Sequence, residues 1–151
     1  NVNVSKRGEG AINYVGPGGF IDLIANANAL LFCSAWGEGA RYELENGALK
    51  ITEPGKPKFV QEVDEITFNG QEALKHGKTV VYVTHVGAFR LTERGMELIY
   101  VMPGIDVQRD ILDACPMRIV LPESGTPQVV SETIMTGRNF RLNLKDRGDE
   151  S

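Results

Sequence analysis

The sequence predicts one mixed α/β domain with much antiparallel character. Three observations predict this fold. A glycine cluster leads into a segment with helical periodicity and then into a compact apolar run, the order expected for a helix that feeds a buried strand. A hairpin pattern follows around Asn46-Gly47. Alternating segments between Thr79 and Met102 then predict an antiparallel meander.

Composition and charge exclude several classes of protein. The chain has 151 residues, enough to bury a core without disulfides or metal ions. It has 16 Lys and Arg against 20 Asp and Glu, a formal charge of −4, and 42% of its residues are hydrophobic. Such mild acidity argues against a nucleic-acid partner, which a basic face would attract. No apolar run approaches the roughly 20 residues of a membrane-spanning helix, so no membrane partner is expected.

The first half of the chain is predicted to contain two strands, a helix and a hairpin. Alternation over residues 1–5 predicts a short strand. Apolar residues at helical spacing predict a helix from Phe20 to Ala27, with a carboxylate in its first turn. The apolar run 29–34 predicts a buried strand. Residues 41–52 predict a hairpin, because Asn-Gly tolerates the positive φ angles of a two-residue turn.

The second half is predicted to add short helices and the meander. In order these are an alternating segment over 59–68, a short helix over 71–75, strands over 79–84, 88–92 and 96–102, a helix over 106–114 capped by Asp106, and a strand over 119–121. The pattern weakens beyond Pro122. We therefore expect the main body of the fold over 1–121, followed by a partly flexible C-terminal arm and tail over 122–151 that frays from Lys145.

The glycine cluster Gly16-Pro17-Gly18-Gly19 is the most informative chemical feature. Glycine permits unusual φ angles and close approach, and the N–H groups at a helix N-terminus attract negative charge. The turn can therefore hold a phosphate, a carboxylate or a developing oxyanion, or it can be only a tight corner. It is not a dinucleotide-binding fingerprint, because Ile21 stands where glycine is needed. It is not a P-loop, because no Gly-Lys-Ser/Thr follows.

The two cysteines fit no metal or redox spacing. Cys33 lies in an apolar run and is expected to be a small buried thiol, and Cys115 follows a predicted helix. Both are expected to be reduced and structural, and without a leader pattern a cytoplasmic protein is favoured. The first residue is Asn1 rather than methionine, which predicts that an N-terminal part is missing.

The other polar candidates are expected to be structural. His76 falls at a helix end and His85 in a hairpin connection, and no set of three or four ligands converges, so no metal is predicted. Glu45 belongs to the solvent face of the hairpin, and neither Ser34 nor Ser124 lies in a nucleophile elbow. A surface salt-bridge set is expected from Asp106, Arg109 and Asp110.

Several sequence blocks follow one another in a characteristic order and spacing. The most specific block is 16–22, with the pattern G-x-G-G-F-[IM]-[DN], and the others are 2–6, 59–63, 66–70, 89–92, 103–106 and 109–112. Over about Val2 to Leu121 the chain resembles the C-terminal part of family I CoA-transferases, in particular the single-chain acetate/propionate and 3-oxoacid enzymes. The resemblance implies the open α/β layered fold of that superfamily, with the hairpin and meander as an antiparallel elaboration. It also implies that residues 1–121 are the C-terminal part of the catalytic lobe.

The resemblance also implies a mechanism. A glutamate carboxylate attacks an acyl-CoA thioester and forms a mixed anhydride. The released CoA thiolate then captures the glutamyl carbonyl, which gives a glutamyl-CoA thioester and a free acid. Main-chain N–H groups would stabilise the carbonyl oxyanions, so Gly16, Gly18, Gly19 and Phe20 are the expected oxyanion or CoA-binding residues. CoA is a co-substrate, no further cofactor is implied, and acetate, ketone-body or short-chain fatty acid metabolism is the expected setting.

One departure from the family pattern limits this expectation. The family's nucleophilic glutamate lies upstream of the segment that Asn1 to Lys6 matches, and Glu9, Glu38 and Glu45 do not occupy its position. No catalytic residue is therefore predicted within this chain, and the chain alone is expected to be an inactive fragment of a homo-oligomeric enzyme. The alternative is a non-catalytic CoA- or anion-binding or structural subunit paired with a separate catalytic chain.

Overall fold

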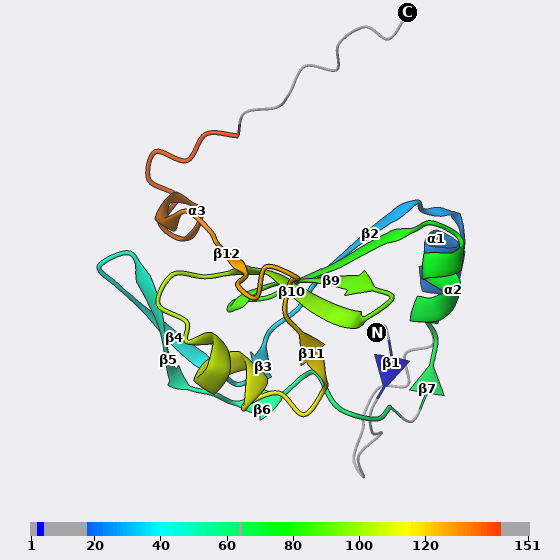
Figure 1. The fold of residues 1–151 in the computed structure, drawn as a ribbon, viewed down its shortest axis with the longest axis horizontal. Coiled ribbons are helices and arrows are strands. Elements are labelled where there is room, and N and C mark those ends of the chain that lie inside the picture. Colours follow the sequence, from blue (N-terminus) through cyan, green and yellow to red (C-terminus); the bar gives the residue numbers. More distant parts are fainter. Residues whose placement is uncertain (1–2, 5–17, 64, 143–151) are drawn as a thin grey trace, which may run out of the picture.

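A six-stranded sheet forms the centre of the computed structural model, which describes residues 3–4, 18–63 and 65–142 (Figure 1). Its strands lie in the order β11-β10-β9-β8-β2, and β12 also pairs with β10. The bounds are β2 (Ala29–Cys33), β8 (Thr79–Val83), β9 (Gly87–Thr92), β10 (Gly95–Val101), β11 (Ile119–Val120) and β12 (Gln128–Val129). The sheet is open, as the family resemblance implies.

Strand directions in this sheet are mixed. β2 and β8 run parallel, with Leu30 opposite Val80, whereas β8, β9 and β10 form the predicted antiparallel meander. β11 and β12 both pair parallel with β10, at its beginning and its end. The mixed α/β class with an antiparallel elaboration is therefore confirmed.

The predicted hairpin is present as β4 (Arg41–Glu45) and β5 (Ala48–Glu53). Its turn has φ angles of 51° at Asn46 and 78° at Gly47, the pair of positive values that a two-residue hairpin turn needs. Two small antiparallel pairs complete the strands, β1 (Asn3–Val4) with β7 (Glu65–Ile66) and β3 (Gly37–Glu38) with β6 (Lys56–Pro57).

The alternating segment over 59–68 forms only the two-residue strand β7 among its described residues. Its first residue is instead held by ring packing. The Phe59 ring lies 5.5 Å from Trp36 and 6.0 Å from Phe89, centroid to centroid. Phe59 and Phe68 therefore reach the core from a largely irregular segment, whereas Ile66 is 69% exposed, so the alternation does not mark a continuous strand.

The helices are short, and a side chain caps the N-terminus of each described helix except the first. They are α1 (Phe20–Asn26), α2 (Gly70–Lys75), η1 (Val107–Leu112) and α3 (Glu132–Thr136). Asp106 accepts the Arg109 N–H at 2.8 Å, as expected of an N-cap, but η1 is a π-helical turn and is shorter than the predicted helix over 106–114. None of the helices among the described residues has the length and apolar character to cross a membrane.

Two hydrophobic clusters hold the sheet. Helices α1 and α2 lie at one end of it (Figure 1), where Phe20, Ile24 and Ala73 pack with Leu30 and Val80. The larger cluster centres on side chains with at most 7% exposure and joins the meander to η1 and the β4–β5 hairpin; it contains Trp36, Val86, Phe89, Leu98, Val101 and Ile111.

Strand β2 is less buried than the sequence predicts. Leu30 is buried, but Leu31 is 69% exposed and Cys33 is also exposed. β2 is the last strand of the described sheet, and no described element covers the face that Leu31 occupies. Full burial was expected because the run is apolar. An apolar run, however, does not reveal whether both faces of its strand are covered.

We expect the isolated chain to self-associate through this edge. Among the described strands β2 pairs only with β8, so its other edge presents backbone groups without a described partner, and the side chain of Leu31 beside that edge is exposed. Such an edge favours strand-to-strand association. Light scattering over a concentration series should show the mass rising with concentration. A monodisperse monomer throughout the series would contradict this prediction.

Part of the segment predicted as an arm joins the body of the fold. β12 pairs with β10, and the Val130 N–H donates to the Val101 carbonyl at 3.0 Å. Helix α3 then lies at the tip of the hairpin, where a Cβ on Gly47 would meet the Glu132 side chain. The predicted frayed tail from Lys145 lies outside the described residues.

Candidate functional site

The glycine turn lies at the start of α1. Gly18 has a φ of +51°, which favours glycine, and Gly19 is the N-cap, with an ordinary φ of −70° and no side-chain cap. Both residues are exposed. Gly16 lies outside the described residues. The structure thus brings Gly18, Gly19 and Phe20 together at one helix end.

No described atom lies close beside this turn. A Cβ added to Gly18 or Gly19 would meet no described atom within 4 Å. At Gly19 neither the backbone conformation nor the packing among described residues requires glycine. By contrast, a Cβ on Gly87 would meet the Tyr100 carbonyl, so the packing of β9 against β10 explains that glycine. The main chain at Gly19 can therefore be approached closely by a group that the described residues do not supply.

Phe20 has a packing role. Its ring is half-buried and lies 6.1 Å from the Phe32 ring, in the cluster between α1, α2 and the sheet. This packing fixes the position of α1 and therefore the direction of its first N–H groups. Phe20 can meet a ligand with its main chain while its side chain holds the helix in place.

A groove of about 570 Å³ lies where the parallel strands β2 and β8 end. Ligands of open α/β sheets bind beyond the carboxyl ends of the strands, so this groove is a second candidate site. The His85 ring stacks on Tyr42, with centroids 4.7 Å apart, and burial raises the pKa of Tyr42, which keeps its hydroxyl neutral. The remaining lining is mostly apolar or uncharged: Cys33, Ser34, Ala35, Leu49, Val83, Thr84, Met102 and Met135. Gly18, Gly19 and Phe20 do not line it.

The two thiols have different environments. Cys33 is exposed at the groove, so the prediction of a buried thiol was wrong, because β2 has one uncovered face. Cys115 is half-buried, with its Sγ 4.0 Å from the Phe59 carbonyl oxygen. Burial raises the pKa of Cys115, although the neighbouring Met117 backbone opposes the shift. Cys115 is therefore a neutral packing residue, as expected.

We expect the two thiols to react with a disulfide reagent in two phases. Cys33 is accessible, whereas Cys115 combines partial burial with a raised pKa that lowers its thiolate fraction. At pH 8 the slow phase should be at least about tenfold slower than the fast one. Cys33→Ser should remove only the fast phase. A single phase that accounts for both thiols would contradict this assignment.

The structure supports structural roles for the remaining candidates. The His76 ring Nδ1 lies 2.8 Å from the Glu72 carbonyl at the end of α2, and His85 lies between β8 and β9, as predicted. Arg109 forms the predicted ion pair with Asp110 at 2.7 Å, and that contact lowers the pKa of Asp110. Among residues 3–4, 18–63 and 65–142, no group of His, Cys, Asp and Glu side chains is placed to hold a metal.

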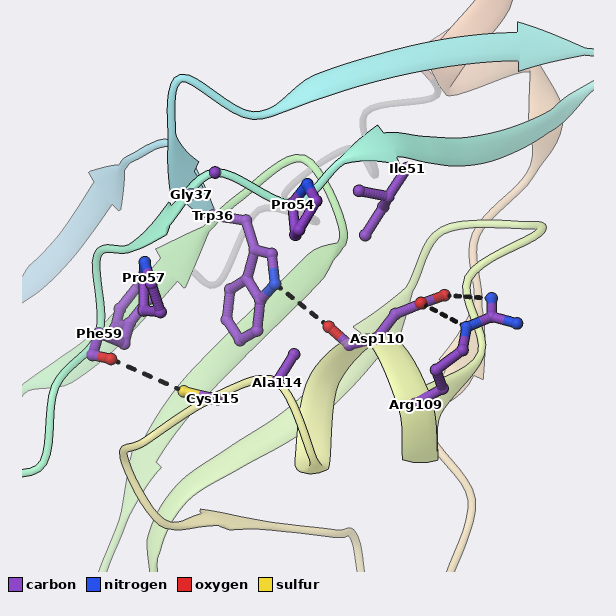
Figure 2. A pocket seen from close by; sticks show the side chains of 11 residues that line it. Trp36, Gly37, Ile51, Pro54, Pro57, Phe59, Arg109, Asp110, Ala114 and Cys115 are labelled. Carbon is purple, nitrogen blue, oxygen red and sulfur yellow. Dashed lines mark hydrogen bonds and ion pairs between the residues drawn. The ribbon is translucent and has the colours of Figure 1, made fainter.

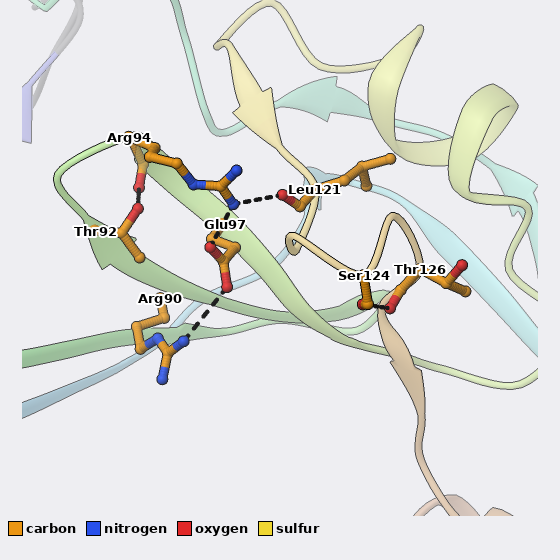
Figure 3. Close-up of polar contacts among 8 residues, drawn as sticks. Arg90, Thr92, Arg94, Glu97, Leu121, Ser124 and Thr126 are labelled. Atoms are coloured by element: carbon orange, nitrogen blue, oxygen red, sulfur yellow. Dashed lines mark hydrogen bonds and ion pairs between the residues drawn. The ribbon is translucent and has the colours of Figure 1, made fainter.

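Glu97 is a charged residue whose burial the sequence did not reveal. It lies on the central strand β10 with 8% exposure, and it accepts from Arg94 at 2.8 Å and from Arg90 at 3.4 Å (Figure 3). Arg94 also donates to the Leu121 carbonyl beyond β11. The hydrogen bond from Arg94 is the main cause that lowers the pKa of Glu97.

This pKa shift predicts a pH-dependent contribution to stability. Because the folded-state pKa lies below the ordinary value of 4.5, the ionised Glu97 stabilises the fold above that pH. The contribution is lost as the pH falls through the folded-state value. Glu97→Gln should therefore unfold at a lower temperature than the unmodified chain at pH 7, and the difference should shrink below pH 4.5 in thermal melts. A difference that is constant with pH would contradict the prediction.

Comparisons with known proteins place the chain among CoA-transferases. No family model matches it. It is 43% identical over 101 residues to the acetate CoA-transferase YdiF of Escherichia coli K12, and 35% identical over 116 residues to the caffeate CoA-transferase of Acetobacterium woodii. These alignments cover 66% and 75% of the chain, but only 19% and 22% of the relatives. The chain thus spans about a fifth of the length of the curated relatives that it matches.

A solved structure agrees. The acyl-CoA transferase YdiF of E. coli O157:H7, crystallised as a thioester complex with CoA, matches 87% of the chain with a TM-score of 0.76 and 34% identity, and the match covers 26% of that protein. Fold and sequence together define an α/β protein of the CoA-transferase class. The chain belongs to family I of the CoA-transferases, the family that its sequence blocks resemble.

Proposed function

We propose that the chain is a C-terminal portion of an enzyme that moves CoA between a short-chain acyl-CoA and a carboxylic acid. The observation that carries the proposal is the 43% identity with an acetate CoA-transferase. The fold match to an acyl-CoA transferase, with a TM-score of 0.76, supports it. CoA thioesters and short-chain acids are the proposed substrates, and CoA is the co-substrate without a further cofactor. Cytoplasmic acetate, ketone-body or short-chain fatty acid metabolism and a homo-oligomeric assembly are parts of the same proposal.

The proposed chemistry proceeds through a glutamyl-CoA thioester. A glutamate upstream of this chain attacks the acyl-CoA carbonyl, which breaks the C–S bond and gives a mixed anhydride and CoA thiolate. The thiolate attacks the glutamyl carbonyl, so the first acid leaves as a carboxylate and glutamyl-CoA remains. A second carboxylate reverses these steps. The solved relative that was crystallised as a thioester complex with CoA supports this route.

This chain would contribute the glycine turn. Each addition step places negative charge on a carbonyl oxygen, and preorganised N–H donors stabilise that charge. Gly18 and Gly19 are exposed, Gly18 adopts a φ of +51°, and the space beside both residues is open. These features support main-chain donation to the oxyanion or close contact with the pantetheine end of CoA, with Gly16 and the Phe20 main chain beside them. No side chain here is needed as a base or nucleophile.

The test is CoA transfer by the polypeptide extended upstream to the length of its relatives. Labelled acetate should enter acetyl-CoA in the presence of the extended enzyme, with the ping-pong kinetics of a covalent intermediate. The 151-residue chain alone should give no exchange. Exchange by the short chain alone would refute the upstream nucleophile, and an inactive extended protein would refute the transferase proposal.

A further inference from the structure

A second cavity lies away from the glycine turn and between segments that are distant in the sequence (Figure 2). Its volume is about 330 Å³. We call it the Trp36 cavity, and its principal walls are Trp36, Ile51, Pro54, Phe59, Ala114 and Cys115. The residues of the groove at the ends of β2 and β8 do not line it, and neither do Gly18 and Gly19.

One wall is fixed by close backbone contacts. A Cβ on Gly37 would meet the Pro54 carbonyl, and a Cβ on Gly55 would meet the Glu38 carbonyl. Gly55 also has a φ of +67°, which glycine tolerates best. The segment before β6 therefore lies directly against β3, and Pro54 and Pro57 have fixed φ angles. This wall is formed before any ligand arrives.

The opposite wall is η1, a π-helical turn. The Asp113 N–H donates to the Gln108 carbonyl at 2.9 Å, five residues back. Turns of this kind are rare, and they occur frequently at functional sites. The Trp36 indole N–H donates to the Asp110 carbonyl at 3.2 Å, which ties the two walls together (Figure 2). The Phe89 ring stacks on the Trp36 ring and supports it, with the two ring centroids 5.4 Å apart.

The charged side chains that line the cavity, Arg109 and Asp110, form an ion pair with each other. Arg109 donates to both carboxylate oxygens of Asp110, at 2.7 Å and 2.8 Å, and the N-cap carboxylate of Asp106 lies one turn earlier. The guanidinium is therefore already paired. Burial holds the Cys115 thiol neutral. An incoming carboxylate or phosphate would find no free cation here among the lining residues, so the acid substrates of the proposed function do not suit this cavity.

We propose that the Trp36 cavity binds a small uncharged ligand whose apolar ring enters between Trp36 and Ala114. The size fits, because an apolar cavity of about 150 Å³ already accepts benzene, and ligand pockets begin near 300 Å³. Aromatic, proline and aliphatic walls supply contact on several sides, while the mouth at Ala114 is exposed. This site goes beyond the proposed transferase function and does not depend on it.

Trp36 supplies a direct reporter, since it is the single tryptophan of the chain. Cyclohexanol, which does not absorb at the excitation wavelength, is titrated into the 151-residue chain while Trp36 emission is recorded. We expect a saturable change in emission. Cyclohexanecarboxylate should bind at least about tenfold more weakly, because its charge would be buried without a partner.

Two matched variants locate the site. Ala114→Phe adds a ring at the exposed mouth and should abolish the saturable change, whereas Ala25→Phe adds the same ring at an exposed position on α1 and should leave the change intact. A response that stays linear with concentration would overturn the proposal. So would saturation that survives Ala114→Phe, or tighter binding of the carboxylate than of the alcohol.

Discussion

Replacing Gly19 with valine is expected to lower the turnover of the extended enzyme by about 100-fold, the effect of losing one oxyanion-hole donor. The branched side chain would fill the open space beside the turn and keep a substrate carbonyl away from the main-chain N–H groups. Because a Cβ at this position meets no described atom, the fold itself should tolerate the change. The measurement is kcat for CoA transfer from acetyl-CoA to a labelled acid.

A matched variant separates crowding at the turn from damage to the helix. Ala25→Val places the same side chain at an exposed position on α1, away from its N-terminus. It should retain nearly full turnover, and both variants should keep the melting temperature within a few degrees of the unmodified enzyme. Normal turnover in Gly19→Val would remove the catalytic role of the glycine turn while leaving the family assignment untouched.

Replacing Phe89 with alanine is expected to lower the free energy of unfolding by about 3–5 kcal/mol. Phe89 is 1% exposed on the central strand β9, and its ring stacks on Trp36 with centroids 5.4 Å apart. The deletion would leave a cavity between the sheet and the loop that carries Phe59. Denaturant unfolding followed by far-UV circular dichroism measures the loss.

The control for this prediction is Leu31→Ala on the edge strand β2. Leu31 is 69% exposed, so its truncation should change the free energy of unfolding by less than about 0.5 kcal/mol. An effect of Phe89→Ala no larger than that of Leu31→Ala would contradict the position of the core. A large effect of Leu31→Ala alone would mean that another chain covers the outer face of β2.

Local signals predicted much of the fold. The hairpin follows from Asn46-Gly47, whose observed φ angles are both positive, and the meander follows from short connections between alternating segments. The start of α1 follows from a change in periodicity after the glycine cluster. Each of these signals involves only a few neighbouring residues, so it can be recognised in a single sequence.

Features that depend on contacts between separate strands were not predicted from the sequence. The exposure of Cys33 depends on what covers β2, and β12 exists because Val129 pairs with Val101 on a strand formed much earlier. The ion pair of Glu97 with Arg90 depends on the register of β9 against β10, which places the two residues opposite each other. The local pattern of residues does not predict these contacts.

The sequence analysis singled out one candidate site and missed another. The binding role of the glycine turn at Gly18 and Gly19 stays a prediction. The Trp36 cavity was not anticipated, because the Trp36 indole and the Asp110 carbonyl that join its walls are 74 residues apart. The π-helical geometry of η1 also escaped detection, since its apolar spacing is that of an ordinary helix.

The most direct test of the proposed chemistry is the position of the covalent CoA adduct. The extended enzyme is incubated with acetyl-CoA without an acceptor acid, quenched, digested and mapped by mass spectrometry. We expect CoA joined as a thioester to one glutamate that lies outside the 151 residues. Attachment to Glu38, Glu45 or any other residue of this chain would contradict an upstream nucleophile.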